Sequence, residues 1–267
     1  MAIASFMKRL FGAPPAAPAP QANNVPDARA GVLAARRAVD ALSRRNDRLD
    51  WAVAQQVLGS ELIAYAETLP GPSAIVTLAE AGDALADALA VTTADDNAAF
   101  RASIVNLRGL AALRRAWRLE GDRKGEALAA AANDFTAVWE LVTPETSRAL
   151  WVEAGFYRGA AFQGLAQLKG GGEGLGWLDE AAHSFDAIAG RGREDGRVHP
   201  IAAYNRYVVL EERARHTPGN AALPYYAEAR RSLAAAMADP GFGPRQPDLT
   251  SRLAALDAAM RGRTGDP

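Results

Sequence analysis

The fold is decided by the stretch Trp151–Ile188, WVEAGFYRGAAFQGLAQLKGGGEGLGWLDEAAHSFDAI, which predicts two amphipathic helices joined by a glycine turn. Gly159 falls inside the first helix, and Gly171 falls in the turn. One face of the second helix carries apolar residues at three- and four-residue spacing, as expected for a helix with one buried side. These residues are Leu178, Ala181, Phe185 and Ile188.

The same pattern returns along the chain at a nearly fixed spacing. Fifty residues earlier stand Gly109, Gly121, Leu128, Ala131, Phe135 and Val138, and a further fifty residues earlier stand Gly59, Gly71, Leu78, Ala81, Leu85 and Ala88. A weaker copy lies 48 residues downstream, with Gly219, Tyr226, Ala229, Leu233 and Ala236. A fixed period of this size predicts an all-α stack of helix hairpins, in which each hairpin buries its apolar face against the next.

The composition agrees with a helical stack and excludes several classes of protein. Alanine and leucine are abundant, which favours helix over strand. The net charge of −1 argues against nucleic acid as a partner. The chain has no cysteine, so disulfides, cysteine-ligated zinc and thiol catalysis are excluded. No stretch approaches the roughly 20 apolar residues of a membrane-spanning helix, and Lys8 and Arg9 argue against a signal peptide.

Proline, glycine and capping residues set the expected boundaries. We expect a short amphipathic helix at residues 1–12 and a proline- and alanine-rich linker at 13–26. An α-solenoid follows at 27–262. It comprises a capping helix at 27–45, helix pairs at 49–91, 95–142, 144–189 and 201–237, and a terminal helix at 248–261. Residues 263–267 are expected to be a disordered tail.

The repeats resemble the tetratricopeptide (TPR) family, specifically its longer bacterial variants. Helix A of the hairpin has the small residues Gly59, Gly109 and Gly159, and Trp51 and Trp151 match the family's early tryptophan. Helix B carries the family's small and large pattern as Ala81/Leu85/Ala88, Ala131/Phe135/Val138, Ala181/Phe185/Ile188 and Ala229/Leu233/Ala236. The resemblance implies a right-handed superhelix with a concave face that binds peptides or proteins.

The chain departs from the family pattern in four respects. The period is longer than the usual ~34 residues. Arg101 and His199 stand at the tryptophan position of the second and fourth copies, and Tyr207 stands at the helix-A glycine of the fourth. The register of the fourth copy is therefore open at this point.

We identify a candidate peptide-binding groove on helix A by counting the family's groove positions from Gly59, Gly109 and Gly159. Amide and aromatic side chains there suit the capture of an extended or helical peptide. The groove residues are Gln56, Ser103, Asn106, Arg114, Glu153, Phe156, Tyr157 and Gln163. The alternative is that most of these side chains are merely solvated.

The first twelve residues form the second informative stretch. A large apolar stripe at helical spacing is flanked by basic residues, and the phrase FMKRLFG resembles short membrane-targeting helices of bacterial cell-division proteins. The expected docking residues are Ile3, Phe6, Met7, Lys8, Arg9, Leu10 and Phe11. The alternatives are that the segment docks on a larger protein assembly, folds back on the repeats or stays disordered.

No pattern in the chain predicts an enzyme. The three histidines, His183, His199 and His216, have no partners at metal-ligand spacing, and the sequence shows no nucleophile elbow or pair of catalytic carboxylates. We therefore expect no catalytic residue, cofactor or metal.

The sequence predicts a cytoplasmic interaction scaffold that binds another protein or peptide and is tethered to the inner face of the cell membrane. The alternative is a structural or cargo-adaptor component whose N-terminal helix docks into a larger assembly.

Overall fold

The computed structural model describes residues 28–242 and 248–264. Within these ranges the chain is all-α and contains no strand. Consecutive helices pack against each other as antiparallel hairpins, which confirms the all-α repeat solenoid. The chain divides into two compact units, with the boundary between Tyr157 and Arg158 inside helix α7. We call residues 28–157 the N-terminal unit and residues 158–264 the C-terminal unit.

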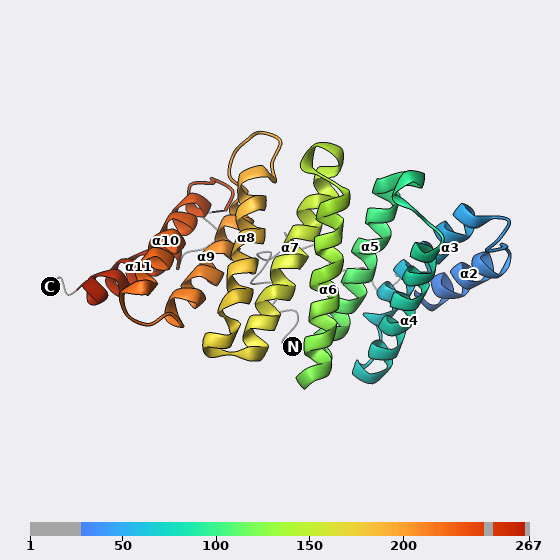
Figure 1. Cartoon of the computed structure of the whole chain (residues 1–267), viewed down its shortest axis with the longest axis horizontal. Helices are drawn as coiled ribbons and strands as arrows, with labels where there is room; N and C mark the ends of the chain where they lie inside the picture. The colour runs from blue at the N-terminus through green and yellow to red at the C-terminus, as the bar shows by residue number, and fades with distance from the viewer. Residues whose placement is uncertain (1–27, 243–247, 265–267) are drawn as a thin grey trace. The chain divides into compact units, whose positions relative to one another are not determined.

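The N-terminal unit begins with a single helix and continues with two hairpins. Helix α2 (Ala28–Asp40) packs against α3 (Arg48–Ala66), which pairs with α4 (Gly71–Ala90). Helix α5 (Ala94–Ala116) packs on α4 and pairs with α6 (Gly121–Leu141). In Figure 1 these helices follow one another in chain order, from blue to green. The first part of α7 (Pro144–Lys169) completes the unit.

The C-terminal unit has the same organisation. The second part of α7 is followed by the 3-10 turn η1 (Gly171–Gly174) and α8 (Leu175–Arg191). Helix α9 (Pro200–Arg215), the 3-10 turn η2 (Gly219–Ala222) and α10 (Leu223–Met237) form the last hairpin. Helix α11 (Leu249–Thr264) packs on α10 and ends the described chain.

In each of the first three hairpins a helix-A glycine faces a large side chain of helix B. A Cβ atom added to Gly59 would lie 2.5 Å from Leu85 Cγ, and one added to Gly159 would lie 2.5 Å from Phe185 Cζ. At Gly109 the corresponding distance to Phe135 Cε1 is 2.9 Å. Even an alanine would therefore overlap the partner side chain, which explains why the smallest residue stands at these positions.

The fourth hairpin has no glycine at this position of helix A and therefore packs differently. Tyr207 occupies the glycine position, and its side chain is fully buried together with Leu233 of α10. The phenol hydrogen-bonds with Glu211 and Arg252, and burial raises its pKa to about 12. A large buried side chain thus stands in helix A of this hairpin, and its polar end has partners.

A repeated arginine contact also joins the two helices of a hairpin. Arg158, next to Gly159, donates to Ser184 Oγ at 2.7 Å and to Glu180 Oε2 at 2.8 Å. Arg206, next to Tyr207, donates to Ser232 Oγ at 2.6 Å and to Glu228 Oε2 at 2.7 Å.

The two contacts span identical sequence separations of 26 and 22 residues. This equivalence fixes the register of the fourth copy at an offset of 48 residues. In the second copy Arg108 makes a related contact with Asp134, at 2.6 and 3.0 Å.

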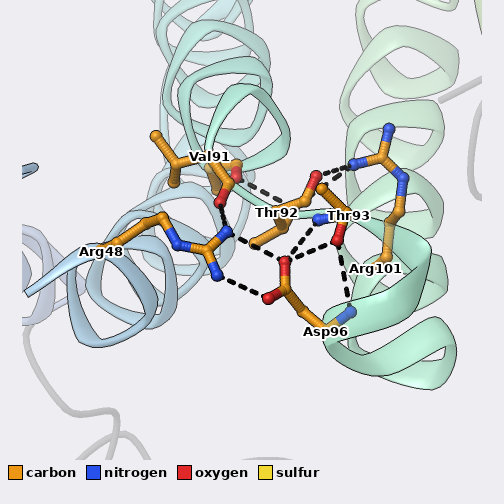
Figure 2. A network of polar contacts seen from close by, with 7 residues as sticks. Arg48, Val91, Thr92, Thr93, Asp96 and Arg101 are labelled. Carbon is orange, nitrogen blue, oxygen red and sulfur yellow. Dashed lines mark hydrogen bonds and ion pairs between the residues drawn. The ribbon is translucent and has the colours of Figure 1, made fainter.

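The junction between the first two hairpins is held by a polar network (Figure 2). Arg48, at the start of α3, donates to the Val91 carbonyl at 2.6 Å and to both carboxylate oxygens of Asp96, at 3.0 and 2.5 Å. Asp96 also accepts from the backbone N–H and the hydroxyl of Thr93, each at 2.8 Å, and so completes the capping box of α5. These contacts connect α3 to the α4–α5 turn.

Arg101 explains one departure from the tryptophan pattern. Its guanidinium donates to the carbonyl of Thr92, as Figure 2 shows, and to that of Leu89 at 3.2 Å. Carbonyl groups at the end of a helix lack partners within the helix. An arginine at this position therefore satisfies two carbonyl acceptors, whereas a tryptophan has a single N–H to donate.

The network makes the stability of the junction dependent on pH. Hydrogen bonds from Arg48 and Thr93 hold the pKa of Asp96 well below its usual value near 4. Since the folded-state pKa is the lower one, the stabilisation is fully present above about pH 4 and is lost as the pH falls below that value. We expect Asp96→Asn to lower the melting temperature at pH 7, and the difference from wild type to shrink progressively below about pH 4.

The matched control for this experiment is Asp95→Asn. Asp95 is an exposed carboxylate in the same first turn of α5, so its replacement removes the same charge near the same helix terminus. Thermal melts of both variants between pH 2.5 and 7 measure the effect. Equal losses for the two variants at every pH would contradict the role assigned to Asp96.

Candidate functional site

The predicted groove residues lie on α3, α5 and α7, the first helices of the first three hairpins. In the N-terminal unit the structure brings two of them into contact, because Gln56 Nε2 of α3 donates to Ser103 Oγ of α5 at 2.7 Å. These two helices thus present the predicted polar side chains on a common side. Gln56 and Ser103 are each half-buried, so the pair lies at the surface of the unit.

Asn106 supplies an acceptor without a partner. Its side chain is only 4% exposed, and among the described residues its Oδ1 atom has no hydrogen-bond partner. Gln55, which was not among the predicted groove residues, has a buried Oε1 atom that also lacks a hydrogen-bond partner among the described residues. A buried acceptor left without a donor costs about 1–3 kcal/mol, so a donor from a ligand would be favourable at either atom.

Tyr157 lies within electrostatic reach of both Glu153 and Arg114. Burial raises the pKa of the Tyr157 hydroxyl, the charge of Glu153 raises it further, and Arg114 lowers it. The hydroxyl is therefore a neutral donor at physiological pH. Arg114 also forms an ion pair with Glu67 at 3.0 Å, and Arg118 binds the same carboxylate oxygen at 3.2 Å.

The two predicted aromatic residues take part in packing. Phe156 is buried, and the ring of Tyr157 lies 5.4 Å from that of Phe135 in a tilted arrangement. Both rings therefore contribute to the interior of the N-terminal unit. Of the two, only Tyr157 carries a polar group, and its side chain is half-buried.

Gln163, the remaining predicted groove residue, belongs to the C-terminal unit and lines a cavity of about 520 Å³. Residues of α7, α9 and α11 form its wall. The lining comprises Gln163, Gln167, Tyr204, Asn205, Val208, Glu211, Glu212, Arg215, His216 and Arg252. Gln163 is 6% exposed and Asn205 is 2% exposed, so two largely buried carboxamides contribute to its wall.

Most charges around this cavity are already neutralised within the chain. Arg215 pairs with Glu211 at 2.5 Å, and Arg252 pairs with Asp248 at 2.5 Å. A hydrogen bond from Arg252 and the positive charge of its guanidinium hold the pKa of Asp248 below its usual value. The cavity wall thus combines neutral amides and a tyrosine with charged side chains, of which Glu211, Arg215 and Arg252 are paired within the chain. This chemistry suits peptide groups better than a strongly charged ligand.

The sequence analysis missed Tyr204 and Asn205, although a signal for them exists. With the register of the fourth copy fixed at an offset of 48 residues, Tyr204 and Asn205 are the equivalents of Phe156 and Tyr157, which were predicted groove residues. Because Tyr207 stands at the helix-A glycine position, the sequence alone left the register of the fourth copy open and did not reveal this correspondence. Arg252 could not be found in this way, because α11 lies outside the repeats.

Residues 28–242 and 248–264 contain no cluster of three or more histidine or acidic side chains able to hold a metal ion. His199 donates its backbone N–H to the Ala189 carbonyl at 3.0 Å, and burial together with Arg193 lowers the pKa of its ring. This backbone hydrogen bond connects the residue before α9 to the end of α8.

Comparisons with protein-family models, with curated proteins and with solved structures found no match. Among the described helices none is long and apolar enough to cross a membrane. The predicted docking residues Ile3, Phe6, Met7, Lys8, Arg9, Leu10 and Phe11 lie outside the described residues.

Proposed function

We propose that this chain is a non-enzymatic adaptor that binds an extended or helical segment of another protein, along the first helices of its hairpins. The observation that carries the proposal is a cavity of about 520 Å³ whose wall contains the carboxamide of Gln163, nearly fully buried, and that of Gln167, which is exposed. A carboxamide offers both a donor and an acceptor, and it therefore matches the N–H and C=O groups of a peptide backbone. Tyr204 adds an aromatic surface beside them.

The N-terminal unit supports the same proposal with a different set of groups. The buried Asn106 oxygen provides an acceptor, the Tyr157 hydroxyl provides a neutral donor, and the Gln56–Ser103 pair lies half-exposed between α3 and α5. A ligand peptide would form hydrogen bonds with the groups of each unit separately. Recognition of backbone groups gives affinity, while neighbouring side-chain contacts give selectivity.

A displayed library of random peptides, screened against the full-length chain, tests the proposal. Enriched peptides should bind with an affinity that falls about tenfold on Gln167→Ala or Gln163→Ala, because one hydrogen bond of about 1–2 kcal/mol is lost. Gln167 is exposed at the rim of the cavity, so its replacement leaves the fold intact.

The control for this screen is Asn133→Ala, which removes an exposed carboxamide from the second-helix side, on α6. It should leave the affinity unchanged. Failure to enrich any peptide, or equal effects of the three substitutions, would overturn the proposed binding site.

The second part of the proposal is a tether. The apolar and basic residues of the first twelve positions would hold the adaptor at an anionic membrane surface. The support is the sequence alone: five large apolar residues at helical spacing beside Lys8 and Arg9, followed by a linker with five prolines. The alternative is an adaptor whose N-terminal helix docks into a larger protein assembly.

Flotation of the full-length chain with anionic vesicles separates the tether from its alternative. Phe6→Ser with Leu10→Ser should reduce binding by tenfold or more, since each large apolar group contributes about 1.5–3 kcal/mol when buried. Ala4→Ser serves as the control and should have little effect. Flotation that is equally strong in the double variant, or absent in the wild type, would contradict the tether.

A further inference from the structure

The cavity of the C-terminal unit has one acidic side chain that no other group of the described chain neutralises. Among the charged residues of its wall, Arg215 pairs with Glu211, and Arg252 pairs with Asp248. Glu212 is the remaining carboxylate, and its side chain forms no ion pair or hydrogen bond with any described residue. The two ion pairs are neutral, so one negative charge at the wall is left uncompensated.

The nearest basic residues of α9 do not supply the missing charge. Arg213 forms an ion pair with Asp179 at 2.8 Å and donates to Thr217 Oγ1 at 2.6 Å. His216 stands one turn after Glu212, and in the described chain no ion pair joins these two side chains. Glu212 is half-buried, so solvent and salt screen its charge less than that of a fully exposed group.

A second group without a partner lies on the same wall. Gln163 of α7 is 6% exposed, and its carboxamide forms no hydrogen bond with any described residue. With the offset of 48 residues between the third and fourth copies, Gln163 is the equivalent of Glu211, the residue before Glu212. Equivalent positions of stacked repeats lie at the same level of the stack. Gln163 and Glu212 therefore line the cavity at about the same level.

The end of helix α9 adds to the negative potential beside Glu212. The helix ends at Arg215, so Glu212 stands in its last turn. The C-terminal end of a helix carries a partial negative charge, because its last carbonyl groups have no partners within the helix. A cation that approaches Glu212 is therefore attracted by both the carboxylate and the helix end.

We propose that the peptide bound in this cavity carries a lysine or arginine side chain that pairs with Glu212. This pairing rests on the proposed function, since it names the chemistry of the segment that the same cavity takes. The carboxamides of Gln163 and Gln167 bind backbone groups, and the basic side chain balances the remaining charge. Its apolar stem suits the wall beside Tyr204 and Val208. An acidic segment would bring a second negative charge to Glu212 and is excluded.

Parallel screens of a displayed library of random peptides test the pairing, with the full-length wild type and its Glu212→Lys variant as targets. Peptides enriched on the wild type should share a lysine or arginine. Peptides enriched on Glu212→Lys should share an aspartate or glutamate in its place. The matched control is Glu173→Lys, which makes the same charge change at an exposed residue of η1 outside the cavity. It should enrich the same basic peptides as the wild type.

A milder substitution separates the charge from the shape of the side chain. Glu212→Gln should weaken the binding of an enriched basic peptide about tenfold, because a charge-assisted hydrogen bond is lost. Replacement of the basic residue of the peptide by glutamine should have a similar effect on the wild type and little further effect on Glu212→Gln. Both Glu212 variants should melt as the wild type does, since Glu212 has no side-chain partner in the described chain.

The outcomes distinguish this pairing from the proposed function itself. Enriched peptides that share no basic residue, or that are the same for the wild type and Glu212→Lys, would overturn the pairing and leave the adaptor function in place. Equal binding of the basic peptide to the wild type and Glu212→Gln would also overturn it. A library that yields no binder for any of the chains would overturn the proposed function and the pairing together.

Discussion

The structure depends on the close approach of two helices at a glycine. In each of the first three hairpins helix A comes so near to helix B that a leucine or phenylalanine of helix B occupies the space of the missing Cβ atom. This contact buries the large side chain completely, at Leu85, Phe135 and Phe185. Burial of such a group contributes about 1.5–3 kcal/mol, and a single hairpin cannot achieve it for both of its faces. Stacking of neighbours is therefore required.

The arginine contacts supply what apolar packing alone does not specify. Apolar side chains tolerate small sliding movements of one helix along another, whereas the bonds from Arg158 to Ser184 and Glu180 require one alignment. Their recurrence at Arg206 shows that the fourth hairpin keeps this alignment although its glycine has been replaced. The polar network at Arg48 and Asp96 has a comparable role between hairpins.

The sequence was sufficient to predict the fold class because the fold rests on local periodicity. The recurrence of Gly59, Gly109 and Gly159 with Leu85, Phe135 and Phe185 predicted the pairing that the structure contains. The arginine contacts were not predicted, since a charged residue beside a glycine has no distinctive pattern until its partner 26 residues away is known. The cavity beside Asn205 was not predicted for a related reason. Its residues on α9 align with the predicted groove positions only when the register of the fourth copy is known, and the arginine contacts supply that register. Helix α11 contributes Arg252 from outside the repeats, which no periodicity could indicate.

The central claim is tested most directly by a double-mutant cycle between Gly159 and Phe185, measured by chemical unfolding. Gly159→Ala should lower the free energy of unfolding by about 1–3 kcal/mol, because the added methyl group overlaps the ring. The same substitution should cost nothing in a Phe185→Ala background, which gives a coupling energy of similar size. As a control, Gly82→Ala in α4, where an added Cβ meets no neighbour, should stabilise the chain by about 0.5–1 kcal/mol. Gly159→Ala that stabilises the chain as Gly82→Ala does, or that costs the same in both backgrounds, would contradict the account.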